Sequence, residues 1–526
     1  MKILIADKIS QRAVELLRAE DSWDVVFLPG KEGASVAEEI RDADALLVRS
    51  ATKVTASLLE GAEKLRVIGR AGVGVDNVDL DAATKKGIVV MNTPGGNAVS
   101  VAEHTLALLL SLARRIPQAD NSMKKGQWEK KKLQGIELRS KTLGLVGFGQ
   151  IGTEVARLAK AFEMEIVAYD PYVSSLVARE LNIRLVSLEE LLKVSDFVSL
   201  HASATPETKH LINAKSLALA KPGVRIVNCA RGELINETDL LAALENGQVA
   251  GAGLDVFETE PPKDLRLTGH AGVVATPHIA GSTEEAQEIV GIRIAEQVRD
   301  YLTTGVARNA VNMPAISAEE FKKLEPYIQL GEKLGSFLVQ IAGGRVGEVR
   351  ISYDGGLAEL NTHLVRNAVL KGIMGPALSE QVNLVNAGAL AQSRGIEVAE
   401  LRSARRATFS NSLGIALRTE AETATVLGMV GLRGALRILG INDIDIEAPL
   451  RGVILFIRNQ DVPGVIGRVG TILGNRKLNI ANFALGRNQQ VHEAIGLVNV
   501  DNHIAAEVLD EIRAIPAIQA ARVVEL

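Results

Sequence analysis

Three side chains near the ends of apparent strands have the types that oxidation of an alcohol requires. Arg231 lies in VNCARGELI, Glu260 in DVFETEPP and His278 in ATPHIAG. A histidine accepts a hydroxyl proton, a neighbouring carboxylate stabilises the imidazolium, and an arginine holds a carboxylate through two parallel hydrogen bonds. By residue type alone, however, a lone histidine is usually structural and a lone charge is usually solvated. The three residues need support from a second motif.

A glycine-rich loop supplies that motif. Gly147, Gly149 and Gly152 stand in GFGQIG, directly after the apolar run KTLGLV and before a helical pattern at 153–161. In this spacing the first glycine makes a tight turn, the second lets the backbone approach a pyrophosphate, and the third lets helix and strand pack closely. The helix N-terminus then faces the anion. The loop predicts a dinucleotide site.

An acidic residue after the next predicted strand decides between the two nicotinamide cofactors. Asp170 ends EIVAYD, where a carboxylate accepts hydrogen bonds from the adenosine ribose hydroxyls. Pro171 and Tyr172 follow it, and no arginine stands there to accommodate a 2′-phosphate. The sequence therefore favours NAD over NADP.

The elements that must position these residues alternate along the first 310 residues. Short aliphatic runs alternate with helical patterns, which is typical of βαβ units around a parallel sheet. Strands are predicted, among others, at 2–6, 45–48, 67–69, 144–146, 166–169, 197–200, 225–228 and 273–275. These are too many for one compact open sheet, so we expect an α/β fold with two doubly wound, Rossmann-like lobes. After Gly281, Ser282 and Glu285 are spaced as a capping box for a long helix that returns the chain to the first lobe.

The C-terminal half has no second phosphate loop. Helix-like stretches at 319–341 and 377–393 alternate with glycine-rich turns and predict an α+β domain at 317–450. Its basic cluster of Arg402, Arg405 and Arg406 is more typical of a solvated helix face than of an anion site. The order beyond 451 is strand 453–457, helix 465–475, strands 479–485 and 494–500, helix 505–515 and strand 520–524, a ferredoxin-like βαββαβ motif.

Composition excludes several classes of protein. The chain has 526 residues, 59 basic and 63 acidic side chains, a net charge of −4 and only 3% aromatic residues, which argues against nucleic-acid binding. The one cysteine, Cys229, excludes an internal disulfide and a multi-cysteine metal site, so we expect no bound metal. The absence of disulfides predicts that the protein resides in a reducing cytoplasm. The stretch at 105–113 is too short for a membrane span, and MKILIAD lacks the features of a signal peptide.

Several motifs in order resemble the D-isomer-specific 2-hydroxyacid dehydrogenase family, and most closely its long members that oxidise 3-phospho-D-glycerate. LLVRSATKVT, GRAGVGVDNVDL, NTPGGNAVSVAEHT, GFGQIG, VNCARGELI, DVFETEPP and TPHIAG carry the resemblance, which covers essentially the whole chain. It implies a substrate-binding domain at 1–97 and 286–316, an NAD-binding domain at 98–285, an intervening domain at 317–450 and a regulatory ACT domain at 451–526.

The same resemblance implies residue roles. His278 is the acid/base residue, Glu260 pairs with it and raises its pKa, and Arg231 binds the carboxylate and carbonyl oxygen of the substrate. Asp255 contacts the nicotinamide amide. The implied cofactor contacts are Gly147, Gly149, Gln150, Ile151, Gly152, Asp170, Cys229 and Asp255.

The substrate of these long members, 3-phosphoglycerate, carries a phosphate that needs cations. The resemblance places Arg49 and Arg70 at the substrate cleft and brings a basic residue in from a neighbouring subunit. That residue is one of Lys130, Lys131 and Lys132 after Trp128, and we take Lys131 as the candidate. A solvated face explains the lysine run equally well. The family implies a homo-oligomer, either a dimer or a tetramer.

The C-terminal module resembles ACT domains, which bind small effectors. In the long dehydrogenases the effector is L-serine, and the motif FIRNQDVPGVIGRVGTILGNRKLNIANFALGR places Asn459, Asp461 and Asn479 as its contacts. Aspartate accepts from an ammonium group, and asparagine both donates and accepts. Turn and cap chemistry explains Asp461 and Asn479 as well.

The sequence therefore predicts NAD-dependent oxidation of 3-phospho-D-glycerate to 3-phosphohydroxypyruvate, the first step of serine synthesis, under feedback from serine. Two alternatives stay open at this point. One is another enzyme of the family, such as a glycerate, lactate or hydroxypyruvate reductase. The other is an NADH-sensing binding protein in which turnover is incidental. The C-terminal module and the extra cations favour the first interpretation.

Overall fold

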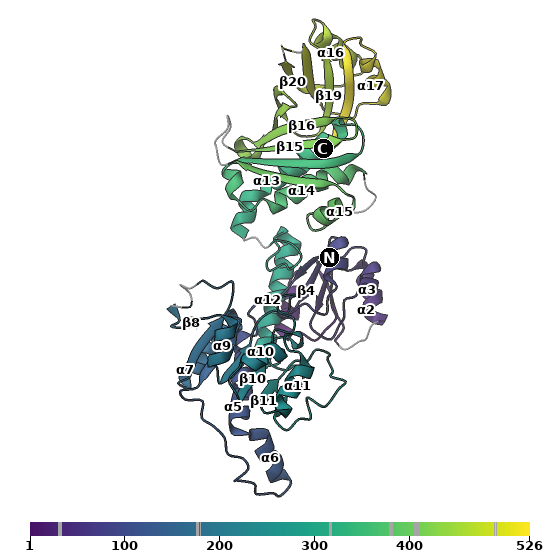
Figure 1. The fold of residues 1–526 in the computed structure, drawn as a ribbon. Coiled ribbons are helices and arrows are strands. Elements are labelled where there is room, and N and C mark those ends of the chain that lie inside the picture. Colours follow the sequence, from purple (N-terminus) through teal and green to yellow (C-terminus); the bar gives the residue numbers. More distant parts are fainter. Residues whose placement is uncertain are drawn as a thin grey trace.

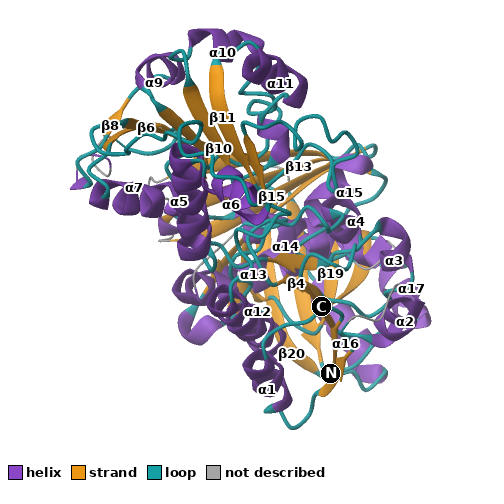
Figure 2. Ribbon diagram, turned by 90° about the horizontal axis from the view of Figure 1, so that it is seen from below, coloured by secondary structure: helices purple, strands orange, loops and turns teal. Residues whose placement is uncertain are grey.

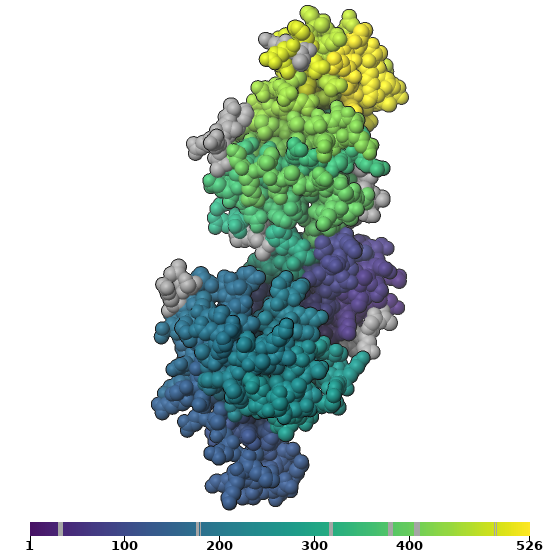
Figure 3. Space-filling view, viewed as in Figure 1, coloured from purple at the N-terminus to yellow at the C-terminus, as the bar shows by residue number. Residues whose placement is uncertain are grey.

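The computed structural model describes residues 1–29, 34–174, 178, 180–314, 318–377, 382–403, 411–488, 490 and 492–526. The molecule is elongated, and the first sheet lies between the second sheet and the third and fourth sheets (Figure 1). The space-filling view shows the C-terminal part of the chain, green to yellow, at one end of the molecule (Figure 3). Two parallel sheets with helices, a mixed sheet and an antiparallel sheet confirm the predicted fold class. Among the described helices, none combines the length and apolar character that a membrane crossing demands.

The first sheet is parallel, in the order β2-β1-β3-β4-β5. Apart from the partly exposed edge strand β2, its strands are almost continuously apolar and buried, as a sheet covered on both faces requires. The strands are β1 (Lys2–Ile5), β2 (Asp24–Phe27), β3 (Ala45–Val48), β4 (Val67–Arg70) and β5 (Val89–Met91), with helices α1 (Gln11–Arg18), α2 (Ala34–Glu39), α3 (Ala56–Glu60) and α4 (Leu80–Lys85).

Helix α12 (Glu284–Thr304) returns the chain to this sheet, as predicted. Val290, Ile294 and Val298 pack against the strands in one buried cluster. The predicted capping box is wrong by one residue: Thr283 is the N-cap, and its side chain accepts from the Ala286 amide. Sequence spacing alone allowed both neighbouring hydroxyl residues.

The second sheet is also parallel, in the order β12-β11-β10-β9-β6-β7-β8. Helices cover both faces (Figure 2). The strands are β6 (Thr142–Val146), β7 (Glu165–Tyr169), β8 (Arg184–Leu185), β9 (Phe197–Leu200), β10 (Val224–Asn228), β11 (Val249–Leu254) and β12 (Val273–Ala275). The helices are α5 (Ala98–Arg114), α6 (Ile116–Lys124), α7 (Gln150–Ala161), α9 (Leu188–Val194), α10 (Ala214–Leu219) and α11 (Glu237–Glu245). The strand order reverses between β6 and β9, where ligands of such sheets bind.

The third sheet is mixed, in the order β14-β13-β15-β16-β17-β18, with only β13 and β14 parallel. Helices α13 (Ala318–Ile341) and α14 (His363–Met374) share its core. The helix predicted at 377–393 is partly wrong, because the helix described there, α15 (Ala387–Ser393), covers only its end. The strands are β13 (Val346–Gly355), β14 (Glu397–Ser403), β15 (Asn411–Thr419), β16 (Thr423–Val430), β17 (Leu436–Ile441) and β18 (Ile444–Pro449).

Arg402, the one member of the basic cluster among the described residues, is not on a helix. Arg402 lies on strand β14, donates to Thr362 Oγ1 over 2.9 Å and stacks over the Tyr353 ring. Arg405 and Arg406 lie outside the described residues. The expected solvated helix face is therefore wrong for Arg402.

The fourth sheet is antiparallel, in the order β20-β21-β19-β22. The chain order is β19 (Val453–Gln460), α16 (Val465–Asn475), β20 (Ile480–Asn488), β21 (Glu493–Val500), α17 (Ala506–Arg513) and β22 (Ile518–Glu525). This order confirms the predicted βαββαβ motif.

Candidate active site

Three neighbouring strands of the second sheet precede the residues that are predicted to carry the chemistry. β10, β11 and β12 are parallel and in register, with Asn228 paired to Leu254 and Leu254 to Ala275. The residues that follow these strand ends include Arg231, Asp255 and His278. Because the carboxyl ends of parallel strands meet at one edge of the sheet, side chains far apart in sequence come together.

His278 and Glu260 form a close pair. The distance from His278 Nδ1 to Glu260 Oε2 is 2.7 Å, and Glu260 Oε1 accepts from the Phe257 amide over 3.1 Å. The hydrogen bond that His278 donates to Glu260 raises the pKa of His278 more than burial lowers it. Burial pushes the pKa of Glu260 upward, but the hydrogen bond and charge of His278 leave it lowered. The pair is thus poised as an ionised carboxylate beside a basic imidazole.

A buried carboxylate holds the loop that carries His278. Asp255 is 0% exposed. Its Oδ1 accepts from Thr276 Oγ1 over 2.6 Å and from the Ile279 amide over 2.9 Å, and its Oδ2 accepts from the Ala280 amide over 2.9 Å. Burial alone would raise the pKa of Asp255, but these bonds and His104 leave it lowered. Its predicted contact with the nicotinamide amide stays a prediction.

Sequence reasoning missed two members of this network. Thr276 Oγ1 lies 3.0 Å from His104 Nε2, and His104 Nε2 lies 3.5 Å from Asp255 Oδ1. His104 is on helix α5, far from Thr276 in sequence. Its place in NTPGGNAVSVAEHT was a signal, although nothing in that motif specified a partner.

The structure gathers the three predicted arginines. Arg49 directly follows β3 and Arg70 ends β4, next to each other in the first sheet. Burial, helped by the charges of Arg231 and Arg49, lowers the pKa of Arg70 to about 10, while Asp76 and Asp7 oppose that change. Arg70 Nε is buried and has no hydrogen-bond partner among the described residues. A cation held in that state is suited to an anionic ligand.

Two residues that sequence reasoning did not select shape the Arg49 loop. Asp7 follows β1 and accepts from the Arg49 amide over 2.6 Å and from Thr52 Oγ1 over 2.6 Å. Asn77 donates to the carbonyl oxygens of Arg49 and Thr52, both over 2.7 Å. These bonds fix the backbone at Arg49, whose side chain donates to the Lys8 carbonyl oxygen over 3.3 Å. Asp7 ends the run MKILIAD, and its position after a strand was the available signal.

The glycine loop fits a pyrophosphate. Gly147 has φ 93°, and a Cβ there would lie 2.7 Å from the backbone of His201 and Ala202. A Cβ on Gly152 would lie 2.4 Å from Gly147 O, so the third glycine lets α7 pack. A Cβ on Gly149, the N-cap of α7, would meet nothing within 4 Å. The space above Gly149 and the helix N-terminus therefore form the expected cradle.

The other predicted cofactor residues surround this loop. Asp170 Oδ2 accepts from the Phe148 amide over 2.8 Å, and Oδ1 accepts from the Tyr172 amide over 2.8 Å. Asp170 thus ties the glycine loop to the loop after β7. Gln150 and Ile151 open α7. The Gln150 side chain lies against Gly95, where a Cβ would be 1.6 Å from its Oε1.

Two buried side chains lie directly after strands β9 and β10 of the second sheet. Cys229 follows β10, and burial raises the pKa of its thiol to about 12, so it is a neutral packing residue. His201 follows β9, and burial lowers its pKa to about 4. Its Nε2 lies 2.9 Å from Ser199 Oγ, while its Nδ1 has no partner among the described residues. Sequence reasoning selected Cys229 as a cofactor contact and did not include His201 among those contacts.

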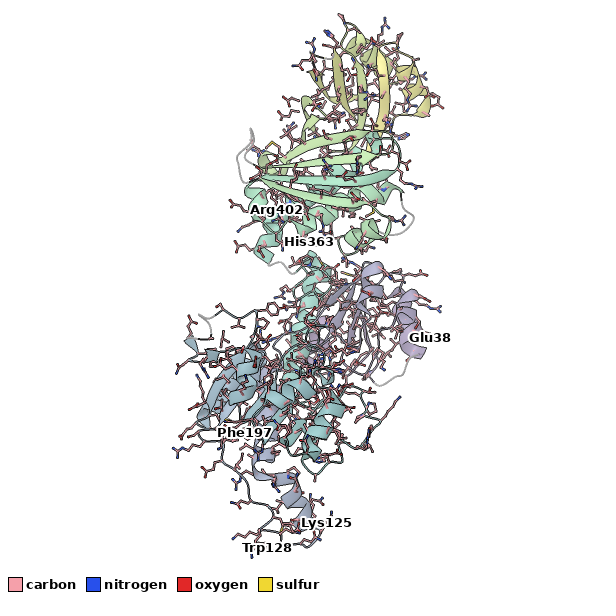
Figure 4. All side chains as sticks on the ribbon, in the orientation of Figure 1. Glu38, Lys125, Trp128, Phe197, His363 and Arg402 are labelled. Carbon is pink, nitrogen blue, oxygen red and sulfur yellow. The ribbon has the colours of Figure 1, made fainter. Side chains whose placement is uncertain are left out.

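Lys131 lies away from the arginines within one chain. It follows α6 in the segment that projects from the end of the molecule, where Figure 4 shows Trp128 and Lys125. Trp128 is 80% exposed. The neighbouring Lys132 pairs with Glu129 at 2.7 Å, as expected for a solvated lysine run. The structure does not bring Lys131 to the site of its own chain.

The three predicted effector residues also do not form one site within a chain. Asn459 and Asp461 lie where β19 leaves the sheet, and Asp461 Oδ2 pairs with Arg487 Nη2 at 2.6 Å. Asn479 directly precedes β20 at the opposite end and donates to Asp501 Oδ2 over 2.7 Å. β19 runs antiparallel to β21 from Val453–Val500 to Gln460–Glu493, so the two ends are separated by roughly 20 Å at about 3.3 Å per residue.

Comparison with protein families finds three matches along the chain. Residues 106–280 match the model of the D-isomer specific 2-hydroxyacid dehydrogenase NAD binding domain. Residues 323–442 match that of the D-3-phosphoglycerate dehydrogenase intervening domain, and residues 453–517 match the ACT domain. The order agrees with the second, third and fourth sheets.

Similar proteins extend over the whole chain. A D-3-phosphoglycerate dehydrogenase of Methanocaldococcus jannaschii is 43% identical over 527 residues, covering 100% of both chains. One of Bacillus subtilis is 41% identical, covering 100% of this chain and 99% of its own. A D-lactate dehydrogenase of Aquifex aeolicus, solved with NAD and lactic acid, is 32% identical with a TM-score of 0.52, covering 60% of this chain and 100% of its own.

The pair of His278 and Glu260 predicts a measurable titration. We expect Glu260→Gln to lower the pKa of His278, because the amide keeps a polar group but loses the charge that favours the imidazolium. Since the folded pKa is raised, the pair stabilises the protein fully below about pH 6.5, and this contribution is lost as pH rises through the folded pKa. Histidine-resolved NMR titration, assigned with His278→Ala, measures the shift.

A control and a contradicting outcome are available in the same chain. Glu525 forms a similar pair with His503 at 2.6 Å in the fourth sheet, so Glu525→Gln is the matched control and should leave the pKa of His278 unchanged. An unchanged or higher pKa of His278 would show that Glu260 does not set its protonation.

Proposed function

The chain belongs to the D-isomer-specific 2-hydroxyacid dehydrogenase family, among its D-3-phosphoglycerate dehydrogenases, and on that premise we propose that it oxidises 3-phospho-D-glycerate to 3-phosphohydroxypyruvate with NAD, as the first step of L-serine synthesis. The observation that carries the proposal is the convergence of His278, Glu260 and Arg231 beside Arg49 and Arg70. A base, a carboxylate anchor and a phosphate anchor match the three polar groups of this substrate.

The residues divide the chemistry between them. Because Nδ1 of His278 donates to Glu260, Nε2 is the nitrogen that accepts the proton of the substrate C2 hydroxyl. Glu260 then stabilises the imidazolium. Arg231 is half-buried at the edge of η2 (Gly232–Leu234) and holds the substrate carboxylate, so that C2 is oriented toward the cofactor edge. NAD, when bound, supplies the acceptor for the hydride leaving C2.

Arg49 and Arg70 would take the phosphate. Arg70 has a buried Nε without a partner among the described residues, and burial together with the guanidinium groups of Arg231 and Arg49 lowers its pKa. A phosphate dianion relieves that repulsion and accepts several charge-assisted hydrogen bonds. This arrangement favours a phosphorylated hydroxy acid over lactate or glycerate.

Gly147, Gly149, Gln150, Ile151 and Gly152 would hold the pyrophosphate of NAD, with Asp170 facing the adenosine ribose. The open space at Gly149 supports the proposed binding of the pyrophosphate. Asp170 keeps acceptor capacity beyond its bonds to the backbone amides, since a carboxylate has about four acceptor sites.

We propose the domain division at 1–97 with 286–316, 98–285, 317–450 and 451–526. We further propose a dimer or tetramer in which Lys131 reaches the substrate phosphate of a neighbouring subunit. Exposed apolar side chains near Lys131 support a contact there, namely Ile116, Met123 and Trp128. The single, buried cysteine agrees with a reducing cytoplasm as the compartment.

L-serine is the proposed effector of the ACT domain. A carboxylate such as Asp461 accepts from an ammonium group, and Asp461 lies two residues after Asn459, at the end of β19. Asn479 lies at the other end of the sheet, so a site that contains all three residues requires a second chain.

Removing the proposed base tests the function directly. We expect His278→Ala to lower kcat for NAD reduction by 3-phosphoglycerate by about a hundredfold or more, the usual scale for a general base. The matched control is His503→Ala, which removes an exposed histidine with a similar carboxylate partner and should leave kcat unchanged. Near-normal turnover of His278→Ala would refute the assignment. NADH binding without turnover by the unaltered protein would favour the NADH-sensing alternative.

Arg231→Lys tests the carboxylate anchor. An ammonium group cannot reproduce the planar fork of guanidinium, so we expect a higher KM for 3-phosphoglycerate, by about tenfold for a charge-assisted bond. Arg266→Lys, an exposed arginine paired with Asp264 at 2.6 Å in the same lobe, is the control. An unchanged KM in the Arg231 variant would contradict the role.

Adding L-serine to the same assay tests regulation. We expect L-serine to slow NAD reduction, D-serine to have no effect, and Asp461→Ala to be insensitive to L-serine with its basal rate unchanged. Asp510→Ala, which removes an ion pair with Arg513 on α17, should remain sensitive. Equal rates with and without L-serine in the unaltered protein would rule serine out as the effector.

A further inference from the structure

One ion pair joins the two parallel sheets at the proposed substrate. Arg231 Nη2, which follows β10 of the second sheet, lies 3.0 Å from Asp76 Oδ2, which follows β4 of the first sheet. Among the ion pairs of the described residues, no other connects the chain before Asn97 with the cofactor sheet. The pair therefore bridges the boundary where the substrate carboxylate must enter.

Asp76 is placed for a temporary contact. Its side chain is 72% exposed, whereas that of Arg231 is 27% exposed. Within the described part of the chain, Asp76 has no other hydrogen-bond or ion-pair partner. An exposed ion pair of this kind contributes little to stability and is easily exchanged for another carboxylate.

Gly74 makes the contact possible. A Cβ at Gly74 would lie 1.9 Å from Arg231 Nη2 and 2.7 Å from Asp76 Oδ2. The guanidinium thus passes over a residue without a side chain to reach Asp76. Arg231 Nη1 is meanwhile held by the Ala230 carbonyl oxygen over 2.6 Å, so the plane of the guanidinium is fixed from its own loop.

The charges around the site leave Asp76 as the exchangeable anion. Arg49, Arg70 and Arg231 repel one another, and Asp7 and Asp76 are the acidic groups that oppose this effect on Arg70. Asp7 is 6% exposed and already accepts from Thr52 and the Arg49 backbone. These hydrogen bonds hold the Asp7 carboxylate in place, whereas the Asp76 carboxylate can move away from Arg231.

We propose that Asp76 is a positioning residue that stands in for the substrate carboxylate on Arg231 when the site is empty and yields Nη2 when the substrate binds. This inference rests on the proposed role of Arg231. Asp76 keeps the guanidinium extended toward the first sheet and reduces the repulsion among the arginines. It also competes with every substrate molecule, so it sets the substrate affinity.

The test is a split between KM and kcat. We expect Asp76→Asn to lower the KM for 3-phosphoglycerate by about fivefold, the upper range for one exposed ion pair, with kcat within about twofold. Asp76→Glu keeps the carboxylate and should return KM to within about twofold of the unaltered protein. Glu63→Gln, which removes an exposed charge from the same lobe, is the matched control.

A second probe separates carboxylate competition from general electrostatics. Glycerol 3-phosphate has a phosphate but no carboxylate, so its competitive inhibition constant should be the same in Asp76→Asn and the unaltered protein. Equal tightening of both ligands, or a KM for 3-phosphoglycerate that stays constant or rises, would overturn the proposal. Thermal melting and NADH binding show whether each variant is folded.

Failure of the proposed function would be visible separately. If the unaltered protein does not oxidise 3-phosphoglycerate, that function is wrong. The KM comparison is then made with the 2-hydroxy acid that the unaltered protein oxidises, because all such substrates present a carboxylate to Arg231. A lower KM in Asp76→Asn with that acid would still support the exchange of Asp76 for the substrate carboxylate on Arg231, and an unchanged KM would refute it.

Discussion

The arrangement of the candidate site at the carboxyl ends of β10, β11 and β12 depends on one buried carboxylate. Asp255 follows β11, between the strands that precede Arg231 and His278, and receives hydrogen bonds from Thr276, Ile279 and Ala280. His278 lies inside that span and has φ 53°, an uncommon backbone conformation for histidine. A buried, ionised carboxylate that lost these donors would be costly, so the loop closes around it. The orientation of the imidazole toward Glu260 follows from this closure.

Charge balance is the second constraint. Three arginines from two sheets are useful for a substrate that carries a phosphate and a carboxylate, but they repel one another when no anion is present. The fold moderates this repulsion with Asp7, which is locked into the backbone of its loop, and with Asp76, which is exposed. The result is a site that is cationic enough to attract the substrate and still stable without it.

The C-terminal half is attached to the substrate side of the molecule. Asn383 Nδ2 donates to Gly87 O over 2.9 Å, and a Cβ at Gly87 would lie 2.0 Å from that nitrogen. Gly87 leads into β5, and beyond β5 Asn92 donates to the carbonyl oxygen of Val73 over 2.5 Å. A continuous set of contacts thus runs from the third domain to the loop that carries Asp76. The fourth sheet, in contrast, is remote from the catalytic edge (Figure 1).

The sequence by itself determined the elements with strong local patterns. The glycine loop, the parallel strands before Arg231 and His278, and the βαββαβ module follow from periodicity and turn chemistry, which act over a few residues. Their resemblance to a family also identified His278, Glu260 and Arg231. Where two neighbouring residues had equal capping ability, as at Ser282 and Thr283, local pattern was insufficient.

Only the tertiary structure decided which distant side chains meet. The pairing of Asp76 with Arg231, the contact of His104 with Thr276, and the separation of Asn479 from Asp461 depend on strand order and register. These are set by the packing of whole sheets and helices, in which each contact joins residues far apart along the chain. No local pattern records such a contact, because its energy exists only after the chain has folded.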